Sequence, residues 1–83
     1  MAGVFREVLK KAQLLRRRAR AAFIKLLNDP SHPSLHLERL LTDSRLWSVR
    51  VDRDHRAVAV RAPEKYLWIW IGDHEEFDQL FPR

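Results

Sequence analysis

Arginine and histidine side chains occur in this chain at spacings that could bring them together on one phosphate group. Arg50 and Arg56 fall within two runs of alternating residues, and His74 follows a third run, just after Gly72. A guanidinium stays charged and matches two phosphate oxygens, and an imidazole gains or loses a proton near neutral pH. These side chains could therefore bind a phosphodiester and transfer protons while it is cleaved.

Each of these residues also has a plainer interpretation. Arg50 could be a solvated, outward-facing strand residue, and Arg56 could form a salt bridge with Asp52 or Asp54. A histidine after a strand, such as His74, is often a surface residue or a helix cap. The pattern alone leaves both interpretations open.

Carboxylates that could act as a base are Glu38 and Glu75, and either could equally be a solvated charge. The remaining histidines, His32, His36 and His55, have weaker cases as catalytic groups. The acidic run 73–76 could suggest a metal, but adjacent residues on one segment rarely converge on one ion. We therefore expect no metal and no cofactor.

The candidate residues lie within or just after three runs rich in β-branched and aromatic residues, 47–51, 55–61 and 66–71. Breaks of the length of hairpin turns, 52–54 and 62–65, separate them. This predicts an antiparallel meander of three strands. A weaker alternating run at 35–40 predicts a fourth strand.

The N-terminal segment has apolar residues at helical spacing from Val4 to Leu27, with basic residues mostly on the other side. Neither Gly nor Pro interrupts residues 4–29, so one long helix is possible, and Pro30 ends it. Near the C-terminus, Asp73 is expected to cap a short helix with Phe77 and Leu80 facing inward.

Strand alternation predicts that Trp47, Val49 and Val51 face the core while Ser48 and Arg50 face outward. The last strand is apolar on both faces, because Leu67, Ile69 and Ile71 oppose Tyr66, Trp68 and Trp70. We expect the C-terminal segment to cover Trp70. For Trp68, packing under a neighbour and exposure to a partner are both open.

Length and composition allow one domain, residues 1–83, with a small core. The chain lacks cysteine, which excludes disulfides and zinc–thiolate sites and suits a reducing cytoplasm. No targeting signal or membrane span is apparent. Residues 1–27 carry eight Lys or Arg against one acid, which predicts an anionic partner or a solvated basic face.

The chain contains four short motifs in order: His-Pro-Ser-Leu at 32–35, Trp-Ser-Val-Arg-Val at 47–51, His-Arg-Ala-Val at 55–58 and Trp-Ile-Gly-Asp-His-Glu-Glu at 70–76. Together these motifs resemble the RelE/ParE superfamily of toxins. The resemblance implies an α+β fold: an N-terminal helical hairpin, bending near 11–15, on a twisted antiparallel sheet of about four strands. Members usually begin with a strand, which is shortened or missing here.

The resemblance implies a bacterial, cytoplasmic toxin neutralised by a cognate antitoxin. It is compatible with a metal-independent endoribonuclease that cleaves mRNA on the ribosome, with a non-enzymatic DNA gyrase inhibitor, and with an inactive relative that only binds antitoxin. Many nuclease members have a tyrosine just after the position of His74, whereas this chain has Phe77.

The resemblance and the charge together assign side chains to three roles. The catalytic candidates are Arg50, Arg56, His74, Glu75 and Glu38. Contacts with RNA or the ribosome are expected from Arg16, Arg17, Arg18, Arg20, Lys25 and Arg53. Contacts with the antitoxin are expected from Trp68, Trp70 and Phe77.

Overall fold

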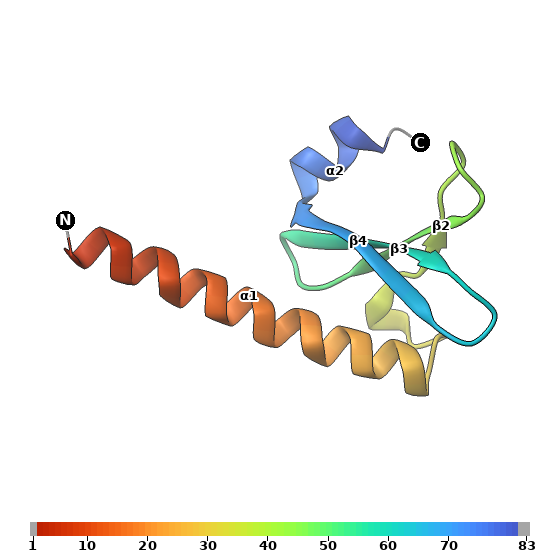
Figure 1. Cartoon of the computed structure of the whole chain (residues 1–83), viewed down its shortest axis with the longest axis horizontal. Helices are drawn as coiled ribbons and strands as arrows, with labels where there is room; N and C mark the ends of the chain where they lie inside the picture. The colour runs from red at the N-terminus through yellow and green to blue at the C-terminus, as the bar shows by residue number, and fades with distance from the viewer. Residues whose placement is uncertain (1, 82–83) are drawn as a thin grey trace.

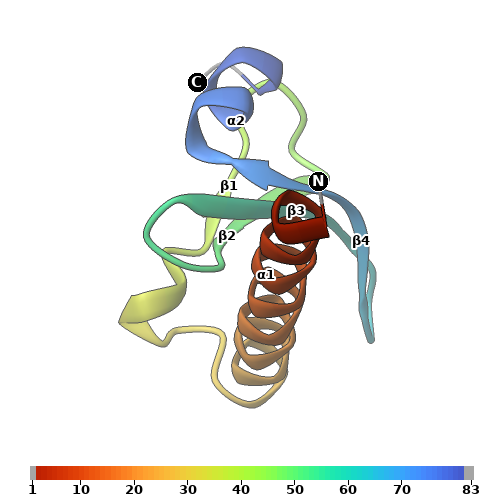
Figure 2. The same cartoon turned by 90° about the vertical axis from the view of Figure 1, so that its left-hand side faces the viewer.

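The computed structural model describes residues 2–81 and has three layers (Figure 1). A long helix lies on one face of an antiparallel sheet and a short helix lies on the other (Figure 2). The elements are α1 (Ala2–Asn28), the 3₁₀ helix η1 (Pro33–Leu35), β1 (Glu38–Arg39), β2 (Leu46–Arg50), β3 (His55–Arg61), β4 (Tyr66–Asp73) and α2 (His74–Leu80). The α+β class and the four-stranded sheet are thus confirmed.

The expected N-terminal helical hairpin is wrong, because α1 is one continuous helix of 27 residues. Its interior is built from residues that favour helix, mainly Ala, Leu, Arg and Lys, and contains no proline or loop-forming segment at which the chain could bend. At about 1.5 Å per residue it extends about 40 Å. Among the described residues no strand precedes α1.

Only the C-terminal half of α1 packs on the sheet. Ala22 and Leu26 are buried with Leu35 and Val49, and Phe23 packs against the same cluster. Residues 6–14 are all exposed, and Val8, for example, has 58% of its surface accessible. The N-terminal half of the helix therefore projects beyond the sheet, as Figure 1 shows. In residues 2–81, no helix combines the length and apolar character needed to cross a membrane.

The sheet order is β1-β2-β3-β4, with every neighbouring pair antiparallel. The strand at 55–61 has its predicted bounds, and the strands at 47–51 and 66–71 are found within two residues of theirs. The predicted strand at 35–40 is mostly wrong. Its first residue belongs to η1, and only Glu38 and Arg39 pair with β2.

A β-bulge in β4 places its two tryptophans on opposite faces of the sheet. Trp68 pairs with Ala59 and Trp70 pairs with Val58, so Ile69 is the extra residue. Val58 and Ala59 are adjacent in β3 and therefore face opposite sides of the sheet. Their partners, Trp70 and Trp68, face opposite sides for the same reason.

The two aromatic contacts agree with this placement. Trp68 stacks on Phe23 of α1, with ring centroids 3.7 Å apart, whereas Trp70 packs against Phe77 and Phe81 on the α2 side. The expected cover of Trp70 by the C-terminal segment is confirmed, and Trp68 is covered by a neighbour.

Three other expectations about burial are corrected. Ser48 was expected to face outward but is fully buried, because α2 covers that face of the sheet. Trp47 is only half-buried, lying between the guanidinium groups of Arg39 and Arg61 rather than under a helix. Leu80 does not face inward, since 58% of it is accessible. The Asp73 cap of α2 is confirmed by a 2.8 Å hydrogen bond that Asp73 accepts from the backbone of Glu76.

We predict that Gly72→Ala destabilises the protein, because a Cβ at this position would lie 2.4 Å from the ring of Trp70. Such overpacking typically costs about 1–3 kcal/mol, measurable by urea unfolding. Trp70→Phe supplies the matched background, since a smaller ring leaves room for the methyl group. An equal cost of Gly72→Ala in both backgrounds would show that the ring contact is not its cause.

Candidate active site at the β2–β3 turn

Two arginines face each other across adjacent strands next to the β2–β3 turn. Arg50 of β2 is the direct register partner of Arg56 of β3, and both side chains are half-buried. Like charges directly opposite each other in a sheet are destabilising. This pair therefore indicates a place where an anion would be stabilised.

Both arginines are held by neighbouring groups. The Nε of Arg50 donates to the backbone oxygen of Asp52 at 3.3 Å. Arg56 donates to the hydroxyl of buried Ser48 at 3.4 Å and lies over the ring of Phe77, 5.3 Å from its centroid. Buried Ser48 thus accepts a hydrogen bond from Arg56, a contact that strand alternation alone did not predict.

A cavity of about 210 Å³ lies beside this arginine pair, at the end of the sheet. It is lined by His36, Arg50, Asp52, Arg53, His55, Arg56 and His74. We call it the arginine cleft. Its lining contains three arginines and three histidines against one carboxylate, so the arginine cleft is suited to an anionic group such as phosphate.

The position of His74 is set by the junction between β4 and α2. Its backbone N–H donates to the backbone oxygen of Asp54 at 2.9 Å, which ties the start of α2 to the β2–β3 turn. Its Nε2 lies 3.3 Å from Oδ2 of Asp78, one helical turn later. This contact is an ion pair when the imidazole is protonated. His74 thus combines access to the cleft with a carboxylate partner.

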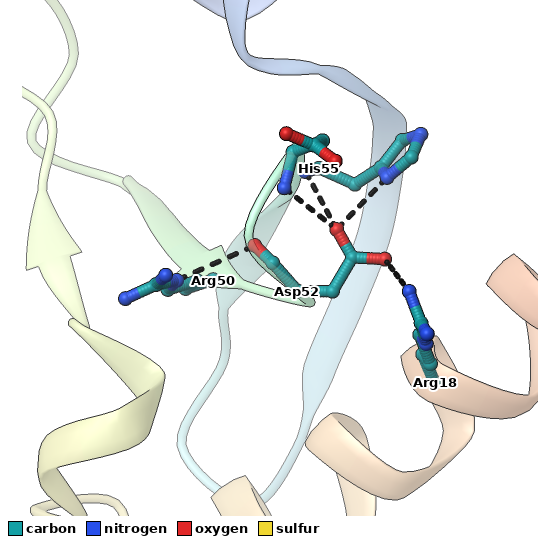
Figure 3. Close-up of polar contacts among 5 residues, drawn as sticks. Arg18, Arg50, Asp52 and His55 are labelled. Carbon is teal, nitrogen blue, oxygen red and sulfur yellow. Dashed lines mark hydrogen bonds and ion pairs between the residues drawn. The ribbon is translucent and has the colours of Figure 1, made fainter.

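The carboxylate of Asp52 organises the turn itself (Figure 3). Its Oδ1 lies 2.9 Å from the backbone nitrogens of Asp54 and His55, which donate to it, and from Nδ1 of His55. Its Oδ2 accepts from Arg18 of α1 at 3.1 Å. Arg50 lies on the other side of the turn from Arg18, as Figure 3 shows.

These contacts keep Asp52 ionised. Burial raises its pKa, but hydrogen bonds from His55, from the backbone of Asp54 and from Arg18 outweigh that effect and lower the pKa from 3.8 to about 2. An ionised carboxylate only accepts hydrogen bonds, so Nδ1 of His55 must carry a proton. The ring of His55 is therefore committed to Asp52.

A second cavity, of about 340 Å³, continues from the arginine cleft toward α1 and shares Arg50, Asp52 and Arg53 with it. Arg18 and Lys25 of α1 also line it. Lys25 donates to the hydroxyl of Ser34 at 3.1 Å. A continuous basic surface thus runs from the cleft to one side of α1.

The other expected RNA-binding residues of α1 lie elsewhere. Arg16, Arg17 and Arg20 line a large open groove, of about 1220 Å³, between α1 and the edge strand β4. Apolar side chains form most of the rest of its lining, including Phe23, Ile24, Leu27, Trp68, Ile69 and Ile71. We call it the edge groove. The basic residues of α1 thus divide between two surfaces.

The remaining predicted site residues fall into two groups. Glu38 and Glu75 are exposed and do not line the arginine cleft. Trp68 and Trp70 line the edge groove, but Phe77 is fully buried and offers no surface to a partner. The exposed apolar residues of β4 are instead Leu67, Ile69 and Ile71.

The arginine cleft is also lined by residues that the sequence pattern did not favour as site residues. His36 was considered a weak candidate, and Asp52 only a salt-bridge partner for Arg56. The available signal was the Asp-Arg-Asp-His run at 52–55, since an aspartate two or three residues before backbone N–H groups typically closes an Asx turn. In the part of the chain that the structure describes, no group of three His, Cys, Asp or Glu side chains could hold a metal ion.

We predict that Asp52 makes the folded state sensitive to acid. Because folding lowers its pKa from 3.8 to about 2, its contribution is complete above about pH 4 and is lost as the pH falls toward about 2. Asp52→Asn should flatten the dependence of the free energy of unfolding on pH in this window, measured by urea titration.

Asp43 provides the matched control. Hydrogen bonds from Arg45 also lower the pKa of Asp43 to about 2, but this pair is exposed and screened by solvent. Asp43→Asn should change the pH dependence much less than Asp52→Asn. If both variants and the parent gave the same slope between about pH 5 and about pH 2, Asp52 would not be the acid-sensitive link.

Comparison with known proteins gives one match. A family model, the ParE-like toxin domain, matches residues 13–79, beginning close to the point where α1 reaches the sheet. Neither the curated proteins nor the solved structures gave a match. The match covers most of the chain and agrees with the order of motifs along it. This protein therefore belongs to the ParE-like toxin domain family, within the RelE/ParE superfamily of toxins from toxin–antitoxin systems.

Proposed function

We propose that this toxin is an endoribonuclease that cleaves mRNA on the ribosome and uses the arginine cleft as its active site. The observation that carries the proposal is the direct cross-strand pair of Arg50 and Arg56. Like charges at directly opposed strand positions are an unfavourable arrangement unless an anion lies nearby. A phosphate beside them would be stabilised by both guanidinium groups, and a pentavalent transition state with more negative charge would be stabilised further.

The reaction needs no metal or cofactor. The ribose 2′-oxygen forms a bond to the adjacent phosphorus after its proton passes to a base, and the bond from phosphorus to the 5′-oxygen breaks. The leaving 5′-oxygen takes a proton from an acid. The products carry a 2′,3′-cyclic phosphate and a 5′-hydroxyl. In this proposal His74, which lies beside Asp78, acts as the acid, and Arg50 and Arg56 hold the phosphate oxygens; their shared cleft supports these roles.

The basic surface that leads from the cleft offers a path for the RNA backbone. Lys25, Arg50 and Arg53 all line the second cavity, and Arg50 and Arg53 also line the arginine cleft. Phosphate contacts of this kind position a nucleic acid without reading its sequence. The ribosome would then supply the mRNA in an accessible single-stranded form.

The edge groove suits the antitoxin. It joins exposed apolar side chains of β4 to a rim formed by Arg16, Arg17 and Arg20. A helix or strand with one apolar face and acidic flanks would match both features. The outer edge of β4 has no strand partner among the described residues, so it could also accept an added strand. Trp68 and Trp70 would contribute to this contact from the groove lining.

Gyrase inhibition is the second candidate, and two observations favour it. The matching family model is named for ParE, the branch that in the resemblance contains gyrase inhibitors. Phe77 also stands where many nuclease members carry a nearby tyrosine, and it is buried under Arg56. The projecting half of α1, with Val8 and Leu9 exposed, would then be the surface available to gyrase.

We predict that Arg56→Ala and His74→Ala abolish toxicity and mRNA cleavage while leaving antitoxin binding nearly unchanged. Loss of one preorganised charged donor typically costs about 100-fold to 1,000-fold in rate, and loss of a proton-transfer group about 100-fold or more. Cleavage is measured on mRNA in a purified translation system by primer extension, with end-group analysis for 2′,3′-cyclic phosphate.

Arg56→Lys is the control for Arg56, because it keeps the charge but loses the two-pronged guanidinium. It should retain more activity than Arg56→Ala, and thermal unfolding should confirm that each variant is folded. The nuclease proposal fails if both alanine variants stay fully toxic. It also fails if the parent leaves translated mRNA intact and causes gyrase-dependent DNA breaks instead.

We further predict that the two basic sides of α1 serve different partners. Lys25→Glu with Arg53→Glu should weaken salt-sensitive binding to ribosomes, because these residues lie on the surface that leads to the cleft. Arg16→Glu, Arg17→Glu and Arg20→Glu should weaken antitoxin binding more strongly. Ribosome co-sedimentation and antitoxin titration, each at two salt concentrations, separate the effects. If both sets of substitutions weakened ribosome binding and antitoxin binding equally, the assignment of the two basic surfaces to different partners would be wrong.

A further inference from the structure

His36 has a backbone conformation that is unusual for its residue type. Its φ of 44° and ψ of 47° place it in the left-handed region, and it is the one residue other than glycine with positive φ in the described chain. A side chain with a Cβ atom pays a cost in this region, of about 1–2 kcal/mol. Such conformations recur at functional sites, where the surrounding structure maintains them.

The local structure explains how this conformation is maintained. His36 follows η1 as its C-terminal cap, and its backbone N–H donates to the backbone oxygen of Pro33 at 3.3 Å. The preceding residue, Leu35, is buried in the core beneath α1. Leu35 thus anchors the segment, and the sharp turn at His36 brings an imidazole from a separate loop to the arginine cleft.

The ring of His36 differs from the other three imidazoles of the chain. His32 bonds to Ser34, His55 to Asp52 and His74 to Asp78. Within residues 2–81 no hydrogen bond or ion pair of the His36 ring is recorded. It is exposed and lines the arginine cleft together with Arg50, Arg53 and Arg56.

We infer that His36 is the base of the cleavage reaction and acts opposite His74. This inference rests on the nuclease function proposed above and supplies the base that Glu38 and Glu75, which do not line the cleft, leave unassigned. The neutral ring of His36 takes the proton of the ribose 2′-hydroxyl as the 2′-oxygen bonds to phosphorus. The bond to the 5′-oxygen breaks, and protonated His74 gives its proton to that oxygen. One imidazole gains a proton and the other loses one.

The simpler alternative is that His36 only ends η1, since left-handed residues commonly terminate helices. The two roles make opposite predictions for His36→Asn. Asparagine tolerates the left-handed region better than most residues and so keeps the cap, but its amide cannot serve as a base near neutral pH. A capping role predicts full activity for this variant. A base predicts loss of activity in a protein that is at least as stable as the parent.

The test is a single-turnover cleavage assay on ribosomes programmed with an mRNA that carries a cut site mapped with the parent toxin. His36→Asn should cleave about 100-fold or more slowly than the parent, with an unchanged or higher melting temperature. The matched control is His32→Asn. Asparagine keeps the N-cap of η1 that His32 provides, so this variant should cleave at the parental rate.

A second substrate separates the base from the acid. Sulfur replaces the 5′-bridging oxygen at the cut site, and a thiolate leaves without needing a proton because thiols are far more acidic than alcohols. This substrate should restore cleavage by His74→Ala but not by His36→Asn. Rescue of His36→Asn would overturn its assignment as the base.

The outcomes distinguish this inference from the nuclease proposal. If the parent cleaves, Arg56→Ala does not, and His36→Asn cleaves at the parental rate, the role of His36 is overturned and the nuclease function stands. If the parent itself leaves mRNA intact on the ribosome, both are overturned.

Discussion

The carboxylate of Asp52 is the contact on which the rest of the site depends. It closes the β2–β3 turn through the backbone of Asp54 and His55, and it reaches α1 through Arg18. The backbone oxygen of the same residue accepts from Arg50. One small residue thus joins a helix, a turn and a strand in a protein whose core is small.

The tie to α1 adds a charged contact to a helix that packs on the sheet largely through small side chains. Its buried residues are mainly the small Ala19 and Ala22, together with Leu26. Small side chains let the helix approach the sheet closely, but they bury little apolar area. The ion pair between Arg18 and Asp52 adds a contact between this helix and the β2–β3 turn.

The bulge at Ile69 allows the edge strand β4 to pack against the helices on both faces of the sheet. Without an extra residue, Trp68 and Trp70 would face the same side of the sheet. With it, Trp68 covers the α1 face and Trp70 covers the α2 face, where it also lies against Gly72. Both helices are thereby packed against an aromatic residue from the same strand.

Alternation and turn chemistry were sufficient to predict much of this fold. The strand at 55–61 follows from its alternating residues and the polar turns on either side, and the cap of α2 follows from Asp73. The bulge could not be predicted in this way, because inserting one residue changes the facing of β4 without altering its composition. The burial of Ser48 likewise depends on α2, which covers that face of the sheet. The alternation of residues within a strand does not show whether a helix will cover either face.

The continuity of α1, in contrast, is indicated by the sequence itself, whereas the resemblance predicted a hairpin. Residues 4–29 lack any helix breaker, and the expectation of a hairpin came only from the resemblance. Within the site, the arginines and His74 could be proposed from residue type and motif. The position of His36 in the lining of the arginine cleft could not, because it depends on the left-handed backbone that follows buried Leu35.

The basic character of α1 shows why charge alone was not enough to assign its partners. Successive residues of a helix are rotated by about 100°, so adjacent arginines need not share a surface. Arg17 therefore lines the edge groove, while Arg18, the next residue, points to Asp52 and the turn. The run Arg16-Arg17-Arg18 looks like one basic cluster in the sequence but serves two sides of the helix. The sheet beneath α1 decides which of its charges lies on the side of the arginine cleft and which borders the edge groove.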